Sequence, residues 1–256
     1  INFAYWMVKH DMTYQEPNLE LIDEWAEAWS YGLIKASMEL AQEKGMCPKT
    51  SETKYGQGIT PNQTYKKDVD ELVKHKERLD WKQLRKDLKE HGIRNSTLMA
   101  LMPAETSAQI SNSTNGIEPP RSYVSIKQSK HGVLKQVVPG FPYYKNKYDL
   151  LWDQKSPQGY LKIMAVLQKY IDQGISVNTS YNPEHYEDEK VPMSVLIQDL
   201  LMFYKYGGKQ LYYNNTFDGQ GEIDINKDTA NGVVDTPEAV SNVEFIDDDD
   251  CESCKI

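Results

Sequence analysis

The stretch TLMALM, residues 97–102, is a continuous apolar run that ends at Pro103. A run of this length without polar alternation is typical of a strand buried on both faces, as the strands of parallel sheets usually are. It follows a segment with helical periodicity, and a strand that follows a helix indicates an α/β layer. The stretch therefore predicts the α/β fold class.

Residues 103–107, PAETS, connect this strand to a predicted helix start. At such a junction the first backbone N–H groups of the helix are unpaired, and the positive end of the helix dipole faces outward. The hydroxyls of Thr106 and Ser107 add two donors, so this corner can hold a phosphate. Ser and Thr at a helix start are more often ordinary caps, and the residue types alone favour that alternative.

Two helices are predicted before this strand. Apolar residues over 19–44 recur at helical spacing, with Asn18 as the N-cap and Gly45 just past the end. A second helix is predicted over 80–92, and the turn formers of 46–64 predict a loop between the two. After the strand, the pattern predicts a hairpin of residues 122–128 with 133–138. It then predicts helices over 159–174 and 192–206 and a short strand over 210–213.

The charge is unevenly distributed along the chain. The formal net charge is −9, and eleven acids but only two bases lie beyond Gly219. The neutral body argues against nucleic-acid binding, which needs a net basic face, but it allows a phosphorylated small-molecule substrate. No apolar stretch of about 18 residues is present, which argues against a membrane span. The acidic tail, with few aromatics and no helical period, is predicted to be flexible.

The chain has three cysteines and no secretion signal, which indicates a reducing compartment. Cys251 and Cys254 form a C-x-x-C pair on the acidic tail. Zinc would need ligands from another chain, because Cys47 is the only other thiol. A dithiol that opens and closes by exchange is therefore the favoured interpretation, although the adjacent aspartates raise the thiol pKa. Cys47, at a helix exit, is expected to be a structural thiol.

Tyr212 and Tyr213 are adjacent in the predicted strand 210–213. Neighbouring side chains of a regular strand point to opposite faces, so the residue types favour one core ring and one surface ring. A redox role would require both phenols in one hydrogen-bonded line. That arrangement needs an irregular backbone at this point.

Three segments together resemble one known family. Residues 95–121 (NSTLMALMPAETSAQISNSTNGIEPPR) resemble the substrate-phosphate segment of the class Ia ribonucleotide reductase large (alpha) subunit, 211–219 (LYYNNTFDG) its tyrosine-pair segment, and 251–256 (CESCKI) its terminal redox motif. The motifs stand in the family's order, and the resemblance covers essentially the entire chain. It implies the C-terminal portion of that subunit, from a split phage or bacterial gene or as a fragment. The first residues, INFAYW, fit a portion of a larger polypeptide, because they lack an initiator Met and a leader pattern.

The resemblance also implies a fold and roles for residues. Residues 1–118 would be the C-terminal part of a ten-stranded catalytic α/β barrel, 119–219 a small α/β C-terminal domain, and 220–256 a flexible redox tail. The substrate diphosphate would be bound by Pro103, Ala104, Glu105, Thr106 and Ser107, with the Glu105 carboxylate turned away from the phosphates. A radical would pass through Tyr212 and Tyr213, and Cys251 and Cys254 would re-reduce the active-site disulfide.

The partners that the resemblance implies lie mostly outside the chain. They are the N-terminal part of the large subunit, the small (beta) subunit with its metal-tyrosyl radical, thioredoxin or glutaredoxin, and a ribonucleoside diphosphate. The effectors ATP and dATP would bind outside this segment. The chain itself is expected to hold no metal or other cofactor, and to act in the cytoplasm, or the host cytoplasm if viral.

Two departures from the family pattern leave alternatives open. The terminal cysteines are two residues closer in sequence than is often found in the family, which can alter their reduction potential. The radical-forming cysteine would lie upstream of Ile1, so activity is expected only with the missing N-terminal part. The alternatives are a non-catalytic module that binds the small subunit through residues 192–208, and a small dithiol redox protein.

Overall fold

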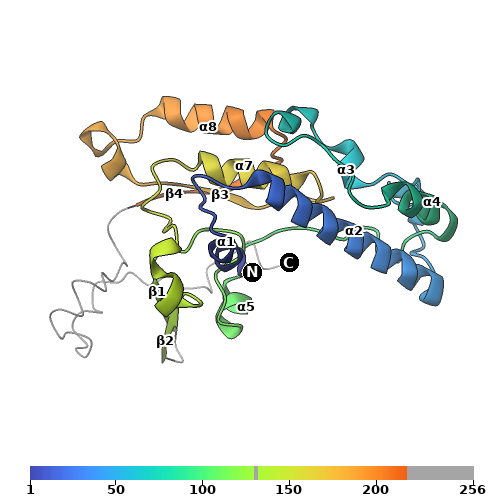
Figure 1. The fold of residues 1–256 in the computed structure, drawn as a ribbon, viewed down its shortest axis with the longest axis horizontal. Helices are drawn as coiled ribbons and strands as arrows, with labels where there is room; N and C mark the ends of the chain where they lie inside the picture. The colour runs from blue at the N-terminus through green and yellow to red at the C-terminus, as the bar shows by residue number, and fades with distance from the viewer. Residues whose placement is uncertain (130–131, 218–256) are drawn as a thin grey trace.

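The computed structural model describes residues 1–129 and 132–217 (Figure 1). The predicted tail, with Cys251 and Cys254, lies outside the described residues. The helices are α1 (Phe3–Lys9), α2 (Leu19–Lys44), α3 (Pro61–Thr64), α4 (Trp81–His91), α5 (Glu105–Ile110), α6 (Phe141–Tyr144), α7 (Gln158–Gln168) and α8 (Met193–Lys205). Short 3-10 turns lie at Thr50–Glu52, Lys67–Glu71, Lys145–Lys147, Pro183–His185 and Glu187–Glu189. The strands are β1 (Val124–Ser129), β2 (Gly132–Val137), β3 (Val177–Tyr181) and β4 (Leu211–Thr216).

The two helices predicted before the apolar run are confirmed, and their ends follow from local capping. The Asn18 Oδ1 accepts a hydrogen bond from the Leu21 N–H at 3.1 Å, which satisfies a free donor at the start of α2. The helix ends at Gly45, whose φ of +84° is rarely adopted by other residues. The Asp80 Oδ1 likewise accepts from the Gln83 N–H at 3.0 Å and starts α4.

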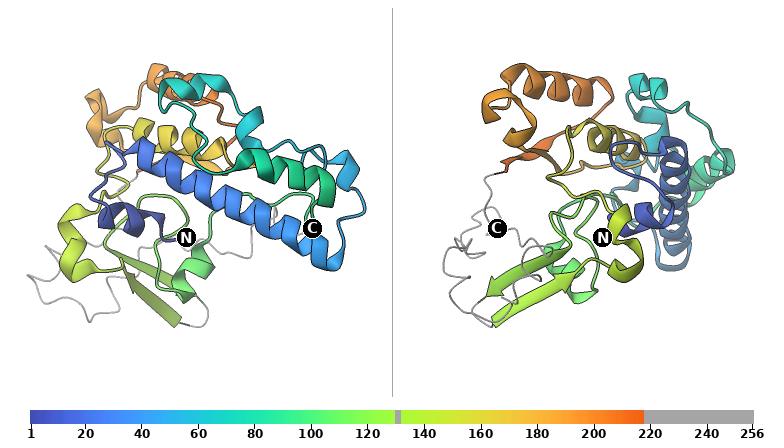
Figure 2. Two further views of the ribbon diagram at one scale, coloured as in Figure 1. Left: turned by 45° about the vertical axis from the view of Figure 1, so that its right-hand side comes forward. Right: turned by 60° about the vertical axis from the view of Figure 1, so that its left-hand side comes forward.

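Helix α7 is the centre of the helical layer. It packs against α2 on one side and α8 on another, while α2 also contacts α4 (Figure 2). Leu161, Ile163 and Met164 of α7 are almost completely buried. Ile22 and Ile34 of α2 and Leu84 and Leu88 of α4 are also buried and belong to the same core cluster. The main core therefore includes side chains of α2, α4 and α7.

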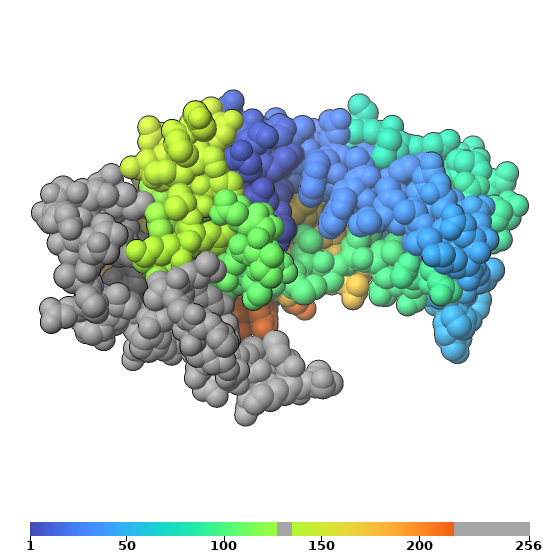
Figure 3. Space-filling model, turned by 90° about the horizontal axis from the view of Figure 1, so that it is seen from below, coloured from blue at the N-terminus to red at the C-terminus, as the bar shows by residue number. Residues whose placement is uncertain are grey.

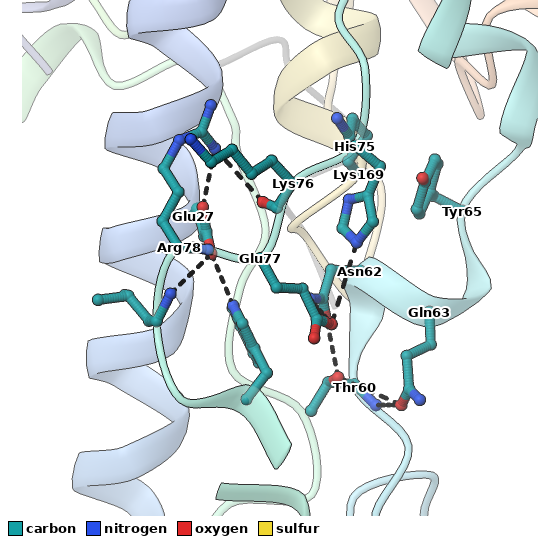
Figure 4. Close-up of polar contacts among 12 residues, drawn as sticks. Glu27, Thr60, Asn62, Gln63, Tyr65, His75, Lys76, Glu77, Arg78 and Lys169 are labelled. Atoms are coloured by element: carbon teal, nitrogen blue, oxygen red, sulfur yellow. Dashed lines mark hydrogen bonds and ion pairs between the residues drawn. The ribbon is translucent and has the colours of Figure 1, made fainter. Parts of the chain in front are cut away.

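A buried ionic network crosses this core. The Lys169 ammonium, just past α7, lies 2.6 Å from the Asp23 Oδ1 of α2, and both side chains are 0% exposed. The Tyr170 hydroxyl donates to the same Asp23 oxygen at 2.9 Å. Arg78 bridges Asp23 and Glu27 with 2.8 Å contacts, and Figure 4 shows its contact with Glu27. Glu27 also accepts from the Trp81 Nε1 at 2.9 Å. The network therefore joins α2, α4 and the end of α7.

The parallel sheet positions the candidate site. β3 pairs with β4 in parallel, and the Tyr181 carbonyl accepts from Phe217 N at the end of this ladder. The backbone of Leu101 bonds to Gly174 O and Ser176 N, just before β3. Since backbone groups of alternate residues face opposite sides of a strand, Leu101 and β4 flank β3 on opposite edges.

The prediction of a regular strand over 97–102 is wrong. Only Leu101 forms a bridge, to Ile175. The Leu98 and Met99 N–H groups instead donate to the carboxylate of Asp172 at 2.8 and 3.0 Å. A side chain thus takes the place of a partner strand, which the apolar pattern does not reveal.

The α/β class is confirmed, but the described residues do not form a closed barrel. Their strands make one two-stranded parallel sheet, extended by the single bridge at Leu101, and a separate antiparallel hairpin. Closure requires a continuous ring of paired strands. The proposed division at residues 118 and 219 stays a prediction.

Several element boundaries differ from prediction. The hairpin and the helix 192–206 are confirmed as β1–β2 and α8. The helix predicted over 159–174 ends at Gln168, because Lys169 N and Tyr170 N bond three residues back and the Gln168 side chain donates to Ile171 O and Gln173 O. β3 and α1 were not predicted from the sequence, and β4 continues to Thr216 beyond its predicted end.

The buried network predicts that removing a buried lysine lowers the free energy of unfolding more than removing an exposed one. Lys169→Met removes the buried cation 2.6 Å from Asp23, and we expect a loss of about 3–5 kcal/mol in the free energy of unfolding. Lys35→Met is the matched control, since Lys35 forms an exposed pair with Glu39 at 3.8 Å, and it is expected to change this free energy by less than about 1 kcal/mol. Urea denaturation of both variants measures the difference, and equal losses would contradict a structural role for the network.

Candidate functional site

Tyr212 and Tyr213 lie together on the surface of β4. Their hydroxyl oxygens are 3.2 Å apart and their ring centroids 4.1 Å apart, with 51° between the ring planes. The residues are 46% and 50% exposed. The favoured expectation of one core ring and one surface ring is therefore wrong, and the alternative arrangement, both phenols in one hydrogen-bonded line, is present.

The backbone irregularity that this arrangement requires is a bulge in β4. Val177 pairs with Leu211, but Thr179 pairs with Asn214, so β4 has one more residue than β3 over this interval. An extra residue in one strand breaks the alternation of side chains, and it re-aims those at the bulge. The bulge therefore allows two consecutive tyrosines to lie side by side.

Side chains of β3 hold the bulge on both sides. The Tyr213 N–H donates to the Asn178 Oδ1 at 3.0 Å. The Thr179 hydroxyl donates to the Asn214 Oδ1 at 3.1 Å. These bonds occupy backbone and side-chain groups next to the point where the ladder is interrupted.

The corner formed by residues 103–107 is exposed, and its hydroxyl residues do not serve as the N-cap. α5 begins at Glu105 with Ala104 at the N-cap position, and no side chain caps it. Thr106 and Ser107 stand in the first turn with exposed side chains. The ordinary capping alternative is therefore not what these two residues do. The green segment around α5 lies at the surface beside the hairpin (Figure 3).

The turn that follows α5 contacts the backbone of the corner. The Ala104 N–H donates to the Asn115 Oδ1 at 2.9 Å. The Gln136 side chain of β2 donates to Ser113 O at 2.9 Å and Ala108 O at 3.3 Å, which ties α5 to the hairpin. The first turn of α5 thus lies at the surface, while the hydrogen bonds of Asn115 and Gln136 hold its backbone in place.

The parallel sheet brings the corner and the tyrosines to one level. Pro103 is two residues beyond Leu101, just as Val177 is two residues beyond its bridge partner. Val177 in turn pairs with Leu211, which precedes the tyrosine pair. The corner and Tyr212 therefore flank β3 from opposite sides, at the level where β3 and β4 begin.

Three polar residues near the site were not predicted from the sequence. They are Asn115, Glu118 and Asn178, and the last two are linked by a 2.6 Å hydrogen bond from the Asn178 Nδ2 to the Glu118 Oε1. Burial raises the pKa of Glu118, while this hydrogen bond and the charge of Arg121 lower it and Glu105 raises it. The available sequence signal was the turn-forming pair Asn115-Gly116; β3 itself was not expected.

The cysteine predictions are tested only in part. Cys251 and Cys254 lie outside the described residues. Cys47 is half-buried against the core, and its Sγ lies 3.1 Å from the Thr50 Oγ1, in keeping with a structural thiol. Within the described ranges no group of three or more His, Cys, Asp or Glu side chains is placed to bind a metal ion. None of the helices described is both long and apolar enough to cross a membrane.

The two cavities differ in their relation to these residues. A cavity of about 210 Å³ borders the tyrosine pair, with Asp199 and Thr179 among its lining residues. A cavity of about 650 Å³ lies instead between residues 53–69, the end of α7 and residues 204–209. None of the predicted site residues within 1–129 and 132–217 lines the larger one, so we place the candidate site at the sheet.

Comparison with known proteins points to one family. Residues 1–214 match the family model described as ribonucleotide reductase, barrel domain. The chain is 51% identical over its whole length to ribonucleoside-diphosphate reductase 1 subunit alpha of Salmonella typhimurium, and 49% to that of Escherichia coli. It is 43% identical, again over its whole length, to the alpha subunit of Enterobacteria phage T4. The chain spans 32% of each of these relatives.

The corner geometry predicts a specific effect of Asn115. Asn115→Ala removes the acceptor for the Ala104 N–H, and we expect a loss of about 1 kcal/mol in the free energy of unfolding and faster hydrogen exchange of the Ala104 amide. Asn115→Asp keeps a side-chain oxygen in the same place and should retain most of the protection. Exchange measured by NMR tests this, and equal acceleration in both variants would show that the side-chain acceptor is unimportant.

Proposed function

The chain belongs to the class I ribonucleotide reductase alpha-subunit family, of which it covers the barrel-domain portion, and from this we propose that it takes part in reducing ribonucleoside diphosphates to deoxyribonucleotides. Its contributions would be substrate diphosphate binding, radical transfer and a reducible dithiol. The paired phenols on the β4 bulge are the single observation that carries this proposal. Complete activity would also need the rest of the large subunit and the small subunit.

The tyrosine pair is suited to moving an electron and a proton together. When one residue is a phenoxyl radical and the other a phenol, the phenol gives one electron and one proton, and the two exchange states. Their hydroxyl oxygens are 3.2 Å apart, so the proton has a direct path. The metal-tyrosyl radical of the small subunit would supply the oxidising equivalent. A thiol in the rest of the large subunit would receive it.

The corner at 103–107 is the proposed diphosphate site. The exposed first turn of α5 presents backbone amides, and Thr106 and Ser107 add hydroxyl donors. The corner stands across β3 from the tyrosines, so a bound diphosphate would anchor the substrate near the end of the radical path. Glu105 would turn away from the phosphates, because like charges repel.

The two tail cysteines would restore the active site after each turnover. Cys251 and Cys254 would give two electrons and two protons to the active-site disulfide, forming their own disulfide, which thioredoxin or glutaredoxin would reduce. As a flexible linker, residues 219–251 would have an r.m.s. reach of roughly 30 Å. That reach would allow the dithiol to visit both a cleft and the surface.

A second candidate function is docking of the small subunit without chemistry. α8 lies at the periphery of the molecule (Figure 1). It exposes large apolar side chains at Met193, Ile197, Leu200, Leu201 and Tyr204. Such an apolar row is typical of an interaction surface. Phe203 of the same helix is 4% exposed and belongs to the core, so it is not part of this row.

Removing either phenol separates the two candidates. In the enzyme assembled from this chain, the rest of the large subunit and the small subunit, Tyr212→Phe or Tyr213→Phe is expected to lower deoxynucleotide formation at least about a hundredfold, since Phe has no hydroxyl to give up a proton. The affinity for the small subunit should stay nearly unchanged. Normal turnover in either variant would exclude the radical path, and lost affinity would mean that the phenols are packing residues.

The dithiol proposal predicts a difference between single and multiple turnovers. With Cys251→Ser and Cys254→Ser combined, we expect one round of reduction per prereduced enzyme and a loss of thioredoxin-driven multiple turnover, because the shuttle has no thiols to exchange. Rapid-quench measurement of the first turnover, with steady-state measurement beside it, tests this. Cys47→Ser is the matched control and should leave both unchanged. Full thioredoxin-driven turnover in the double variant would exclude the shuttle.

A further inference from the structure

Asn178 makes two hydrogen bonds with opposite ends of its amide. Its Oδ1 accepts from the Tyr213 N–H at 3.0 Å, and its Nδ2 donates to the Glu118 Oε1 at 2.6 Å. It lies on β3 between Val177 and Thr179, whose partners on β4 are separated by one extra residue. Asn178 thus contacts the backbone of the bulge at the residue that carries the second phenol.

The acceptor on Glu118 determines which way the amide faces. An asparagine amide has one accepting and one donating end, and only the accepting end can bond to an N–H. A carboxylate can only accept, so Glu118 holds the donating end and leaves Oδ1 for Tyr213. The reversed amide would place a donor against the Tyr213 N–H and leave two donors unpaired.

The surroundings of Glu118 make this bond costly to lose. Burial raises the pKa of its carboxyl group, and Glu105 adds to this effect. The Asn178 hydrogen bond and the charge of Arg121 act in the opposite direction. Without Asn178 the half-buried carboxylate would lose a donor that compensates its burial.

The same carboxylate is joined through backbone to the phosphate corner. Glu118 N donates to Asn115 O at 3.4 Å, and the Asn115 side chain accepts from the Ala104 N–H at 2.9 Å. A continuous series of contacts therefore runs from the corner through this turn to Asn178 and the Tyr213 backbone. The two parts of the candidate site share one hydrogen-bonded support.

We propose that Asn178 and Glu118 are positioning residues for the tyrosine pair: Glu118 orients the Asn178 amide, and Asn178 holds the β4 bulge so that both phenols stay within hydrogen-bonding distance. This inference rests on the proposed radical-transfer function for its consequence in turnover. The positioning itself concerns the chain alone. Neither residue touches the reacting oxygens, so they act through Tyr213.

The first test needs no activity. In the 256-residue chain, Asn178→Ala is expected to speed hydrogen exchange of the Tyr213 amide about tenfold, the factor that one lost hydrogen bond of this kind represents. Asn182→Ala is the control. Asn182 is a buried asparagine just past the far end of β3, where its side chain bonds to Trp152 O, so its loss should leave the Tyr213 amide unchanged. An unchanged Tyr213 amide in Asn178→Ala would overturn the proposal.

The second test exchanges the polarity of the pair. Asn178→Asp faces one carboxylate with another and is expected to speed exchange of the Tyr213 amide and to lower deoxynucleotide formation about tenfold in the assembled enzyme. Adding Glu118→Gln restores one donor and one acceptor. The amide at position 118 can donate to one oxygen of the carboxylate at position 178, while the other oxygen of that carboxylate accepts from the Tyr213 N–H. The double variant should recover both measurements to within about threefold.

The outcomes distinguish this proposal from the function on which it rests. Rescue of the Tyr213 amide in the double variant supports positioning, even where Tyr212→Phe and Tyr213→Phe leave turnover intact and so exclude the radical path. Failure of rescue, in a double variant whose circular dichroism and urea unfolding match the parent chain, would show that the polarity of the pair is not what holds the bulge. It would overturn the proposal while leaving the radical path standing.

Discussion

The buried contact between Lys169 and Asp23 is the constraint from which the arrangement of the site follows. It fixes the end of α7 against α2 at a point where neither charge reaches water. The next residues then organise both halves of the site. The Asp172 carboxylate binds the N–H groups of Leu98 and Met99, while the Lys209 ammonium binds main-chain carbonyls of residues 171–173. The segment that leads to the corner at residues 103–107 and the segment that leads to β4 therefore start from one turn.

Features set by neighbouring residues were predictable from the sequence. The Asn18 and Asp80 caps lie within three residues of the amides they bind, so α2 and α4 were placed correctly. β3 was missed because three of its five residues are polar, and its burial depends on partners far along the chain. The strand predicted over 97–102 failed for a similar reason, since Asp172 supplies its hydrogen bonds from more than seventy residues away.

The candidate site was predictable as a set of residue types, but not as an arrangement. The corner and the tyrosines are identifiable from their residue types and motifs, and adjacent tyrosines in a strand need an irregular backbone to lie together. The sequence does not reveal that irregularity, because the bulge exists only in the pairing of β4 with β3. Asn178 and Glu118 carry no motif of their own. Their contact joins positions sixty residues apart, and only the fold brings them together.

The bulge in β4 also sets stability against activity. A strand with one residue more than its partner gives up regular ladder pairing at that point. A regular β4 that kept both tyrosines would form the better sheet, yet it would send the two phenols to opposite faces. Selection for a more stable fold and selection for paired phenols thus act in opposite directions on the pairing of this strand. An engineer who idealised the sheet would lose the feature that distinguishes it.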